Sequence, residues 1–174
     1  MKVLVTGGVR SGKSRHAEEL LAHATAVTYV APGPTTTEDP DPDWAARIQA
    51  HQLRRPAHWR TVETGDLAAA LRCPGPVIVD CLGTWLTRVL DEGEYWEASS
   101  NDVTTVVSGL VDDVLTALRG RDDVVLVTNE VGLGVIPAHR SGRLFRDLLG
   151  AVNLRVAEAC DEVHLVVAGR VIRF

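Results

Sequence analysis

Short apolar runs alternate along this chain with longer segments in which apolar residues recur every three or four positions. Runs rich in β-branched residues predict strands at residues 2–6, 26–31, 59–63, 77–80, 124–128, 163–168 and 171–174. Helical periodicity predicts helices at residues 13–23, 43–55, 66–72, 82–90, 102–119 and 140–160. Asp43 is the expected N-cap of the second helix, and Pro-rich or polar loops are expected at residues 32–42 and 92–101.

This alternation of strands and helices predicts an α/β fold. The strands are apolar along most of their length, which is typical of a mostly parallel sheet with helices on both faces. The last strand follows the tight turn Gly169-Arg170, so we expect an antiparallel strand at the edge of the sheet. With 174 residues and no internal repeats, residues 1–174 are expected to form a single domain.

A phosphate-binding motif lies between the first predicted strand and the first predicted helix. It has the pattern G-x-x-x-x-G-K-[ST] and reads Gly7, Gly8, Val9, Arg10, Ser11, Gly12, Lys13 and Ser14. Glycines let the backbone curl so that its N–H groups point at phosphate oxygens, and the helix N-terminus adds positive potential. Lys13 supplies charge to the β- and γ-phosphates, and the Ser14 hydroxyl is a ligand for Mg²⁺. The segment is therefore predicted to bind the phosphates of a nucleoside triphosphate.

This motif is stronger evidence for nucleotide binding than a glycine-rich turn alone would be. Its four fixed positions arise by chance in about one protein of this size in a hundred, before the strand and helix context is counted. The chain has 18 basic residues, and only Lys2 and Lys13 are lysines. Because lysine is so rare here, its presence at the one position that the motif requires strengthens the prediction.

Two acidic residues follow apolar strands, where the carboxyl ends of a parallel sheet face a ligand crevice. Asp80 ends one strand at the place where P-loop proteins carry the carboxylate that holds Mg²⁺ through water. The alternative role of Asp80 is an N-cap for the next helix, and the P-loop shifts the balance toward the metal role. Glu130 follows another strand, and it is equally well interpreted as a site residue or as a solvated loop acid.

The predicted helix at residues 43–55 carries a histidine among arginines. Arg47, His51 and either Arg54 or Arg55 are three or four positions apart and share one face. A neutral imidazole can attack a phosphorus atom and arginines can hold phosphate oxygens, so a phosphorylated or nucleotidylated His51 is one interpretation. The other is an ordinary surface helix with basic residues near its C-terminus, which the spacing alone favours.

Composition narrows the class of partner. The formal net charge of −5 argues against broad binding to nucleic acid or to anionic membranes. No apolar run has the length of a membrane span, and the N-terminal apolar run is too short for a signal peptide. Three cysteines without CxxC spacing fit a reducing compartment. We therefore expect a cytoplasmic protein without membrane insertion.

Four segments together resemble the bifunctional adenosylcobinamide kinase / adenosylcobinamide-phosphate guanylyltransferase family. They are GGVRSGKSRHAEE at residues 7–19, ARIQAH at 46–51, RPAHWRTVE at 55–63 and VVLVTNEVGLGVIP at 124–137. They occur in the order of the family and extend over nearly the whole chain. The P-loop is shared with many proteins, whereas ARIQAH and TNEVGLG are specific to this family.

The resemblance implies two successive reactions in the assembly of the nucleotide loop of cobalamin. The aminopropanol hydroxyl of adenosylcobinamide is first phosphorylated by ATP or GTP. GTP then loses pyrophosphate to an enzyme histidine, and the GMP passes to the cobinamide phosphate to give adenosyl-GDP-cobinamide. A corrinoid is thus the implied small-molecule substrate. The resemblance also implies a RecA-like P-loop domain and a homo-oligomer, in particular a trimer.

Carried over position by position, the guanylylated histidine of the family falls on His51. For that residue, the resemblance therefore favours the nucleotidylated histidine over the ordinary surface helix. The nucleotide contacts of the family fall on residues 7–14 and on Ala31, Pro32, Gly33, Gln52, Leu53, Arg54, Arg55, Glu63 and Asp80. The chain departs from the family pattern at Ala31-Pro32-Gly33 and at Asp43-Trp44, which follows a longer Pro-rich loop. Both departures lie outside the P-loop and His51.

Two other functions share these sequence features. A P-loop kinase that only phosphorylates a small molecule would use His51 structurally, and it would take up no label from α-labelled GTP. A nucleotide-dependent regulatory module would bind or slowly hydrolyse nucleotide without turning over adenosylcobinamide. These two measurements distinguish the three functions.

Overall fold

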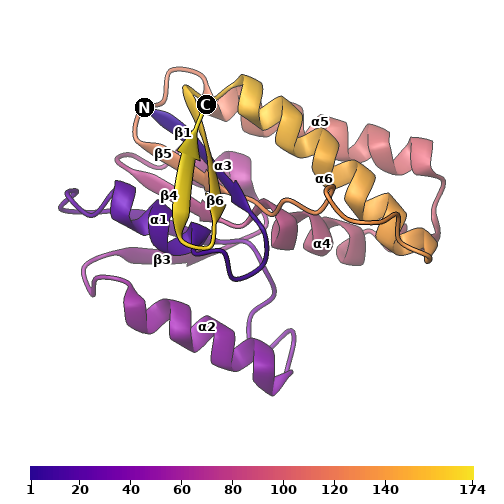
Figure 1. Ribbon diagram of the computed structural model, residues 1–174, viewed down its shortest axis with the longest axis horizontal. Coiled ribbons are helices and arrows are strands. Elements are labelled where there is room, and N and C mark those ends of the chain that lie inside the picture. The colour runs from indigo at the N-terminus through magenta and orange to yellow at the C-terminus, as the bar shows by residue number, and fades with distance from the viewer.

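Seven strands form one central sheet, and the computed structural model describes all 174 residues around it (Figure 1). The strands are β1 (Lys2–Gly7), β2 (Thr28–Ala31), β3 (Arg60–Glu63), β4 (Val77–Asp80), β5 (Val124–Val127), β6 (Glu162–Val167) and β7 (Arg170–Arg173). They lie in the order β3-β2-β4-β5-β1-β6-β7. All neighbouring pairs are parallel except β6 and β7. The predicted mostly parallel sheet with an antiparallel C-terminal edge strand is confirmed.

Helices cover both faces of the sheet, as predicted (Figure 1). One face packs against α1 (Lys13–Leu20), and the other packs against α3 (Leu67–Leu71), α4 (Leu82–Glu92), α5 (Ser100–Leu118) and α6 (Arg140–Glu158). The remaining helix, α2 (Pro42–Arg54), buries no residue, and a short 3-10 helix, η1 (Tyr95–Glu97), lies between α4 and α5. Among the helices, none combines the length and the apolar composition that a bilayer crossing requires.

The alternation of side chains along each strand divides the core into two clusters. Leu4 and Leu126 belong to the larger cluster beneath α3 to α6, whereas Val3 and Val5 pack on the side of α1 with Ala17. Each of these side chains is at most 2% exposed. Burying one aliphatic side chain of this size stabilises the fold by about 1.5–3 kcal/mol. The well-packed sheet therefore holds the ends of the loops at its edge in fixed positions.

Capping residues place several helix boundaries away from their predicted positions. Asp41 caps α2, because its side chain accepts a hydrogen bond from the Asp43 N–H at 2.9 Å, and Pro42 is the first helical residue. The prediction that Asp43 caps this helix is therefore wrong, since proline fits the first helical position and moves the start toward the N-terminus. The helix α5 begins at Ser100, two residues early, because Ser99 caps it.

The strand order brings the predicted nucleotide-binding residues to one edge of the sheet. β1, β2, β4 and β5 run parallel, so their carboxyl ends lie at the same edge. The P-loop leaves the end of β1, and Asp80 is the last residue of β4. β5 lies between these two strands, which is the arrangement expected of a RecA-like P-loop domain.

Candidate functional site

The glycine-rich segment Gly7–Ser14 joins β1 to α1 as a tight loop. Gly12 has a φ of 98°, which residues with a side chain rarely adopt. A Cβ atom on Gly7 would lie 2.4 Å from the carbonyl oxygen of Val166, so glycine is required where the loop meets β6. The Ser11 hydroxyl is buried without a hydrogen-bond partner, and α1 begins without a side-chain cap. The first N–H groups of α1 are thus left without a side-chain partner, and such groups bind phosphate.

The side chain of Lys13 folds back over this loop. Its ammonium group donates to the carbonyl oxygen of Gly8 at 3.1 Å, and the residue is 6% exposed. Burial lowers the pKa of Lys13, and the nearby carboxylate of Asp80 opposes that shift. An ammonium group has three N–H donors, so two remain for phosphate oxygens after the contact with Gly8.

Asp80 lies beside the P-loop and is almost fully buried, with 7% of its side chain exposed. Tyr29 donates its hydroxyl to Asp80 Oδ2 at 2.5 Å, and the Nδ1 atom of His51 lies 3.5 Å from the same oxygen. Burial raises the pKa of Asp80, but hydrogen bonds from His51 and Tyr29 outweigh this effect and hold the pKa below its ordinary value. The carboxylate is therefore ionised at neutral pH.

The helix after β4 is capped by another residue. The N-cap of α4 is Cys81, whose backbone N–H donates to the Thr84 hydroxyl at 3.4 Å in a capping box. The carboxylate of Asp80 faces Tyr29 instead. The interpretation of Asp80 as the helix cap is therefore wrong, and its charge is left for the site.

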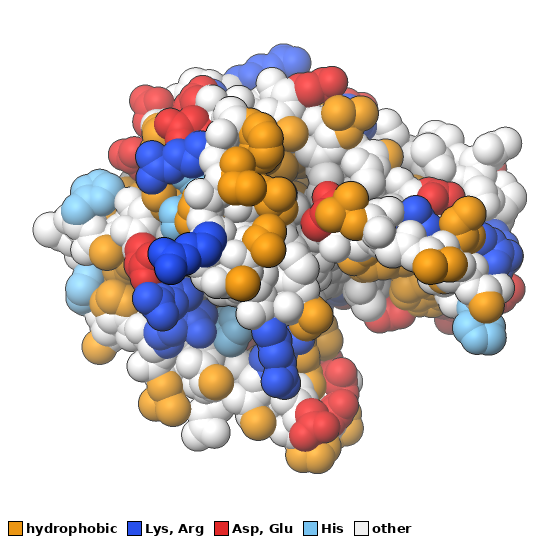
Figure 2. Space-filling view, in the orientation of Figure 1, with side chains coloured by type: hydrophobic (Ala, Val, Ile, Leu, Met, Phe, Trp, Pro, Cys, Tyr) orange, Lys and Arg blue, Asp and Glu red, His pale blue; other side chains and the backbone are white.

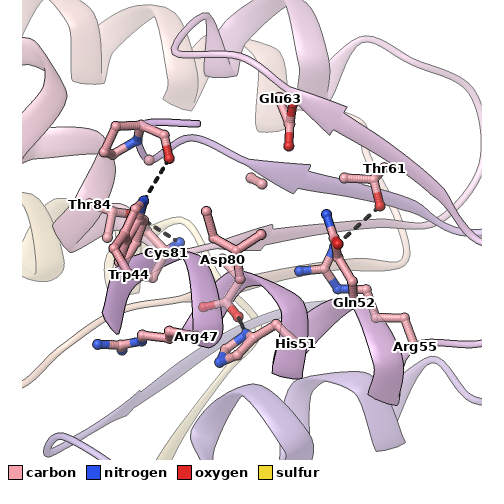
Figure 3. A pocket seen from close by; sticks show the side chains of 14 residues that line it. Trp44, Arg47, His51, Gln52, Arg55, Thr61, Glu63, Asp80, Cys81 and Thr84 are labelled. Atoms are coloured by element: carbon pink, nitrogen blue, oxygen red, sulfur yellow. Dashed lines mark hydrogen bonds and ion pairs between the residues drawn. The ribbon is translucent and has the colours of Figure 1, made fainter. Parts of the chain in front are cut away.

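Polar contacts hold α2, which carries His51, against the rest of the protein. Arg54 forms two hydrogen bonds of 2.6 and 2.8 Å with the carboxylate of Glu18 on α1. The guanidinium carbon of Arg55 lies 3.4 Å from the centre of the Tyr29 ring, which is a cation–π contact. These contacts orient α2 so that the imidazole of His51 faces the end of β4 (Figure 3).

Two cavities meet at His51. A groove of about 920 Å³ is lined on one side by residues 10–15 and on the other by α2. Basic side chains gather between α1 and α2, and acidic ones lie near one end of α2 (Figure 2). A second pocket lies between α2 and the ends of β2, β3 and β4 (Figure 3). Trp44, Arg47 and His51 line both cavities, so the imidazole stands where they join.

Most of the predicted nucleotide contacts come together around these cavities. The second pocket is lined by Ala31, Gly33, Gln52, Arg55, Glu63 and Asp80 in addition to His51. Arg54 lines the groove at the P-loop, although its guanidinium is already paired with Glu18. Pro32 is buried and Leu53 is 80% exposed, and neither lines one of the two cavities. Within the P-loop, Val9 is 76% exposed and lies outside the groove.

Glu130 lies apart from both cavities. Its carboxylate accepts a hydrogen bond from the Gly132 N–H at 2.9 Å, and its own N–H donates to the carbonyl oxygen of Gly7 at 3.1 Å. Glu130 thus connects the loop after β5 to the start of the P-loop. These contacts favour the interpretation of Glu130 as a loop residue.

Two residues of the site are not predicted by the sequence pattern. Tyr29 reaches Asp80 from within β2, and Trp44 lines both cavities while its indole N–H donates to the Pro34 carbonyl at 2.9 Å. A tyrosine inside an apolar strand carries no local signal of a site. Its role depends on the pairing of β2 with β4, which places the two side chains next to each other.

Comparison with known proteins identifies the family of the chain. The family model for cobinamide kinase / cobinamide phosphate guanyltransferase matches residues 3–174. The bifunctional adenosylcobalamin biosynthesis protein CobU of Salmonella typhimurium is 42% identical, with 97% of each chain covered. CobU of Escherichia coli is 40% identical over 97% of each chain. CobP of Pseudomonas aeruginosa is 39% identical over 97% of this chain and 94% of its own. The resemblance found in the sequence is confirmed, and this chain belongs to the cobinamide kinase / cobinamide phosphate guanyltransferase family.

Proposed function

We propose that this chain phosphorylates adenosylcobinamide with ATP or GTP and then transfers GMP from GTP to the product through a covalent intermediate on His51. The observation that carries the proposal is the position of His51 where the P-loop groove and the second pocket join. A triphosphate with its outer phosphates on the P-loop and its nucleoside in the second pocket would present the α-phosphorus to the imidazole.

The first reaction is a direct phosphoryl transfer. Lys13 and the N–H groups of the P-loop hold the β- and γ-phosphates, and the substrate hydroxyl attacks the γ-phosphorus. The protein therefore needs no nucleophile for this step. Its contribution is to position the triphosphate and to neutralise the charge that spreads over the phosphate oxygens.

The second reaction consists of two successive displacements at the α-phosphorus. His51 attacks and pyrophosphate leaves, and a phosphate oxygen of the cobinamide phosphate then attacks the same phosphorus and releases the histidine. Arg47 and Arg55 line the second pocket with His51 and are the cations available to the α-phosphate. Arg54 acts through the placement of α2, because its guanidinium is paired with Glu18.

We assign Mg²⁺ to the Ser14 hydroxyl and the Asp80 carboxylate. A hydrogen bond from Ser14 contributes to the low pKa of Asp80, so the two side chains are neighbours, and both offer the oxygen ligands that Mg²⁺ prefers. Such sites use one or two protein oxygens and take the remaining ligands from phosphates and water. When bound, Mg²⁺ neutralises charge on the triphosphate.

Asp80→Asn should lower the use of Mg²⁺-nucleotide in both reactions by about 10- to 100-fold. The asparagine amide oxygen can still accept the Tyr29 hydroxyl, so the shape is kept and the charge is lost. The measurement is the rate of each reaction as Mg²⁺ is titrated, with thermal unfolding of the variant recorded alongside. Asp113→Asn, on the exposed side of α5, is the control. An unchanged Mg²⁺ dependence of both reactions contradicts the metal role.

We assign recognition of the guanine base to Glu63, which lies across the second pocket from His51 (Figure 3). A carboxylate accepts two hydrogen bonds. Guanine offers an N1–H and an amino group side by side, whereas adenine offers an amino group beside an acceptor nitrogen. The carboxylate can therefore accept two hydrogen bonds from guanine. With adenine, one carboxylate oxygen would face the acceptor nitrogen, which is unfavourable.

Glu63→Gln should reduce the preference of GMP transfer for GTP over ATP by about tenfold or more, because the amide presents an N–H to the guanine donors. The measurement is kcat/KM for adduct formation with each nucleotide. Glu97→Gln, on the exposed side of η1, is the control. Equal losses with GTP and ATP would show that Glu63 does not read the base.

We further propose a cytoplasmic homo-oligomer, in the form of the trimer that the resemblance implies. Apolar side chains on the surface support self-association, because large exposed apolar patches mark interaction sites. Leu133, Val135 and Ile136, in the loop before α6, are 87%, 95% and 70% exposed. Others gather over the β6–β7 hairpin (Figure 2). Three free cysteines fit a reducing compartment.

The deciding experiment incubates the protein with α-labelled GTP and Mg²⁺, maps any labelled residue and measures turnover of adenosylcobinamide. Label on His51 together with turnover is the expected result. Phosphorylation without label would identify a kinase that uses His51 structurally. Nucleotide binding with neither label nor turnover would identify a regulatory module.

A further inference from the structure

The imidazole of His51 has two nitrogen atoms, and the structure distinguishes them. Nδ1 lies 3.5 Å from Asp80 Oδ2 (Figure 3). Nε2 has no hydrogen-bond partner in the protein, and His51 lines both cavities. Only one of the two nitrogens is therefore held by the protein, and the other is left for a substrate.

The carboxylate of Asp80 determines where the proton of the neutral imidazole lies. An ionised carboxylate is an acceptor only, so the ring nitrogen facing it must carry the hydrogen. This places the lone pair on Nε2. The separation of 3.5 Å is long for a hydrogen bond, so in this geometry the contact fixes the tautomer and the direction of the ring rather than binding it tightly.

Tyr29 in turn fixes the carboxylate. Its side chain is 1% exposed, and its hydroxyl donates to Asp80 Oδ2 at 2.5 Å. The ring also supports the Arg55 guanidinium at 3.4 Å. The phenol is the donor in this hydrogen bond, because an ionised carboxylate can only accept. One rigid side chain therefore contacts both Asp80 and Arg55, which line the second pocket.

We propose that Tyr29 and Asp80 are positioning residues that keep a proton on Nδ1 of His51, so that Nε2 is the atom that receives the GMP. This inference rests on the proposed function and adds to it the reacting atom and two supporting residues. Both contacts use Oδ2, so Oδ1 of Asp80 remains available for the magnesium role. The two roles of the carboxylate are therefore compatible.

The lone pair of Nε2 forms a bond to the α-phosphorus, and the bond from that phosphorus to the α,β-bridging oxygen breaks, with its electron pair leaving on pyrophosphate. The proton on Nδ1 stays in place, so the ring becomes a phosphorylated imidazolium cation beside the Asp80 carboxylate. When a phosphate oxygen of the cobinamide phosphate attacks, the P–N electron pair returns to Nε2 and the neutral ring is restored. The retained proton makes the ring a good leaving group.

The first test identifies the nitrogen directly. The protein labelled with ¹⁵N-histidine is treated with GTP and Mg²⁺, and the ³¹P–¹⁵N coupling and the ring proton shifts locate the P–N bond. A bond to Nε2 is the expected result, and a bond to Nδ1 would overturn the inference while leaving His51 as the nucleophile. No adduct on His51 would instead overturn the proposed function, so the two failures are distinguishable.

The second test removes one hydroxyl. Tyr29→Phe keeps the ring and should slow adduct formation at saturating GTP by about tenfold, the usual effect of losing a group that orients a reacting residue. The GTP concentration for half-maximal rate should change less than twofold. The chain has two tyrosines, so Tyr95→Phe, outside the site, is a matched control.

Two comparisons separate positioning from a structural role. In Tyr29→Phe, adduct formation should fall several times more than phosphorylation of adenosylcobinamide, which needs no oriented imidazole. In Asp80→Asn, the neutral amide oxygen holds a proton on Nδ1 less strongly than the carboxylate does, so part of the adduct should move to Nδ1. A Tyr29→Phe protein that behaves like Tyr95→Phe, or that only weakens GTP binding, overturns the positioning role.

Discussion

Replacing Lys13 with alanine should lower the rates of both phosphorylation and GMP transfer by about a thousandfold or more. Both reactions require the triphosphate to be held on the P-loop with its charge neutralised. A loss of that size corresponds to about 4 kcal/mol of transition-state stabilisation, which is typical for removing one positioned charge or donor from such a site. The measurement is kcat/KM for each reaction with the variant and with the wild-type protein.

The surroundings of Lys13 support this prediction independently of the motif. Lys13 is 6% exposed and rests on the carbonyl of Gly8, so its charge is confined to the phosphate-binding loop. The only other lysine is Lys2, whose ammonium lies 3.7 Å from Asp161 at the start of β6. No second lysine can therefore replace Lys13 at the phosphates.

Lys2→Ala is the matched control, because it removes the same side chain from outside the site. It should leave both rates within about twofold of wild type, since a partly exposed ion pair contributes little to stability. Thermal unfolding of both variants shows whether the fold is kept. A folded Lys13→Ala protein with near-normal rates would overturn the assignment of this loop to the triphosphate.

The P-loop and Asp80 could be located from the sequence because their signals are local. The motif requires fixed residues within eight positions, and Asp80 ends a short β-branched apolar run that predicts a buried strand. The strand at Val77–Asp80 was predicted with its observed bounds. In an α/β fold, knowing that a residue ends a parallel strand also places it at the ligand edge.

The partners of these residues could not be predicted in the same way, because they come from distant elements. Tyr29 meets Asp80 only after β2 has paired with β4, across 51 positions of sequence. Arg54 meets Glu18 across 36 positions, and that pairing changes its role from a free cation to an anchor for α2. The spacing of Arg54 along the helix contains no information about Glu18.

His51, the proposed nucleophile, is an intermediate case. Its helical spacing to the arginines alone favours an ordinary surface helix, and the resemblance to the family favours the nucleophile instead. The structure adds an independent observation, because it places the imidazole beside the buried carboxylate of Asp80 rather than on an open surface. A surface histidine would have no reason to face that carboxylate at the junction of two cavities.

Replacing His51 with alanine should abolish GMP transfer and leave much of the phosphorylation of adenosylcobinamide. The proposed transferase step proceeds through a covalent bond to the imidazole, so without that ring the reaction loses its intermediate. The phosphorylation step attacks the γ-phosphorus directly with a substrate hydroxyl and uses no protein nucleophile. The two activities should therefore separate in this variant, whereas Lys13→Ala removes both.

Labelling with α-labelled GTP measures this separation at the level of the intermediate. Wild-type protein should take up label, His51→Ala should take up none, and His23→Ala, which changes an exposed histidine after α1, should behave like wild type. Alanine removes a side chain that is 24% exposed on a helix that buries no residue, so the fold should remain intact. Circular dichroism and thermal unfolding check this.

The chemistry of the adduct gives a second criterion that does not depend on the variant. A phosphorus–nitrogen bond to imidazole is broken in acid, because the ring nitrogen that is not bonded to phosphorus is then protonated and the ring leaves as neutral imidazole. The same bond survives base, which would remove a phosphate ester from serine by elimination. Label on the wild-type protein should therefore be lost in acid and kept in base. Equal labelling of His51→Ala, or an adduct that is stable in acid, rules out His51 as the nucleophile, because each result requires the GMP to be bonded to another side chain.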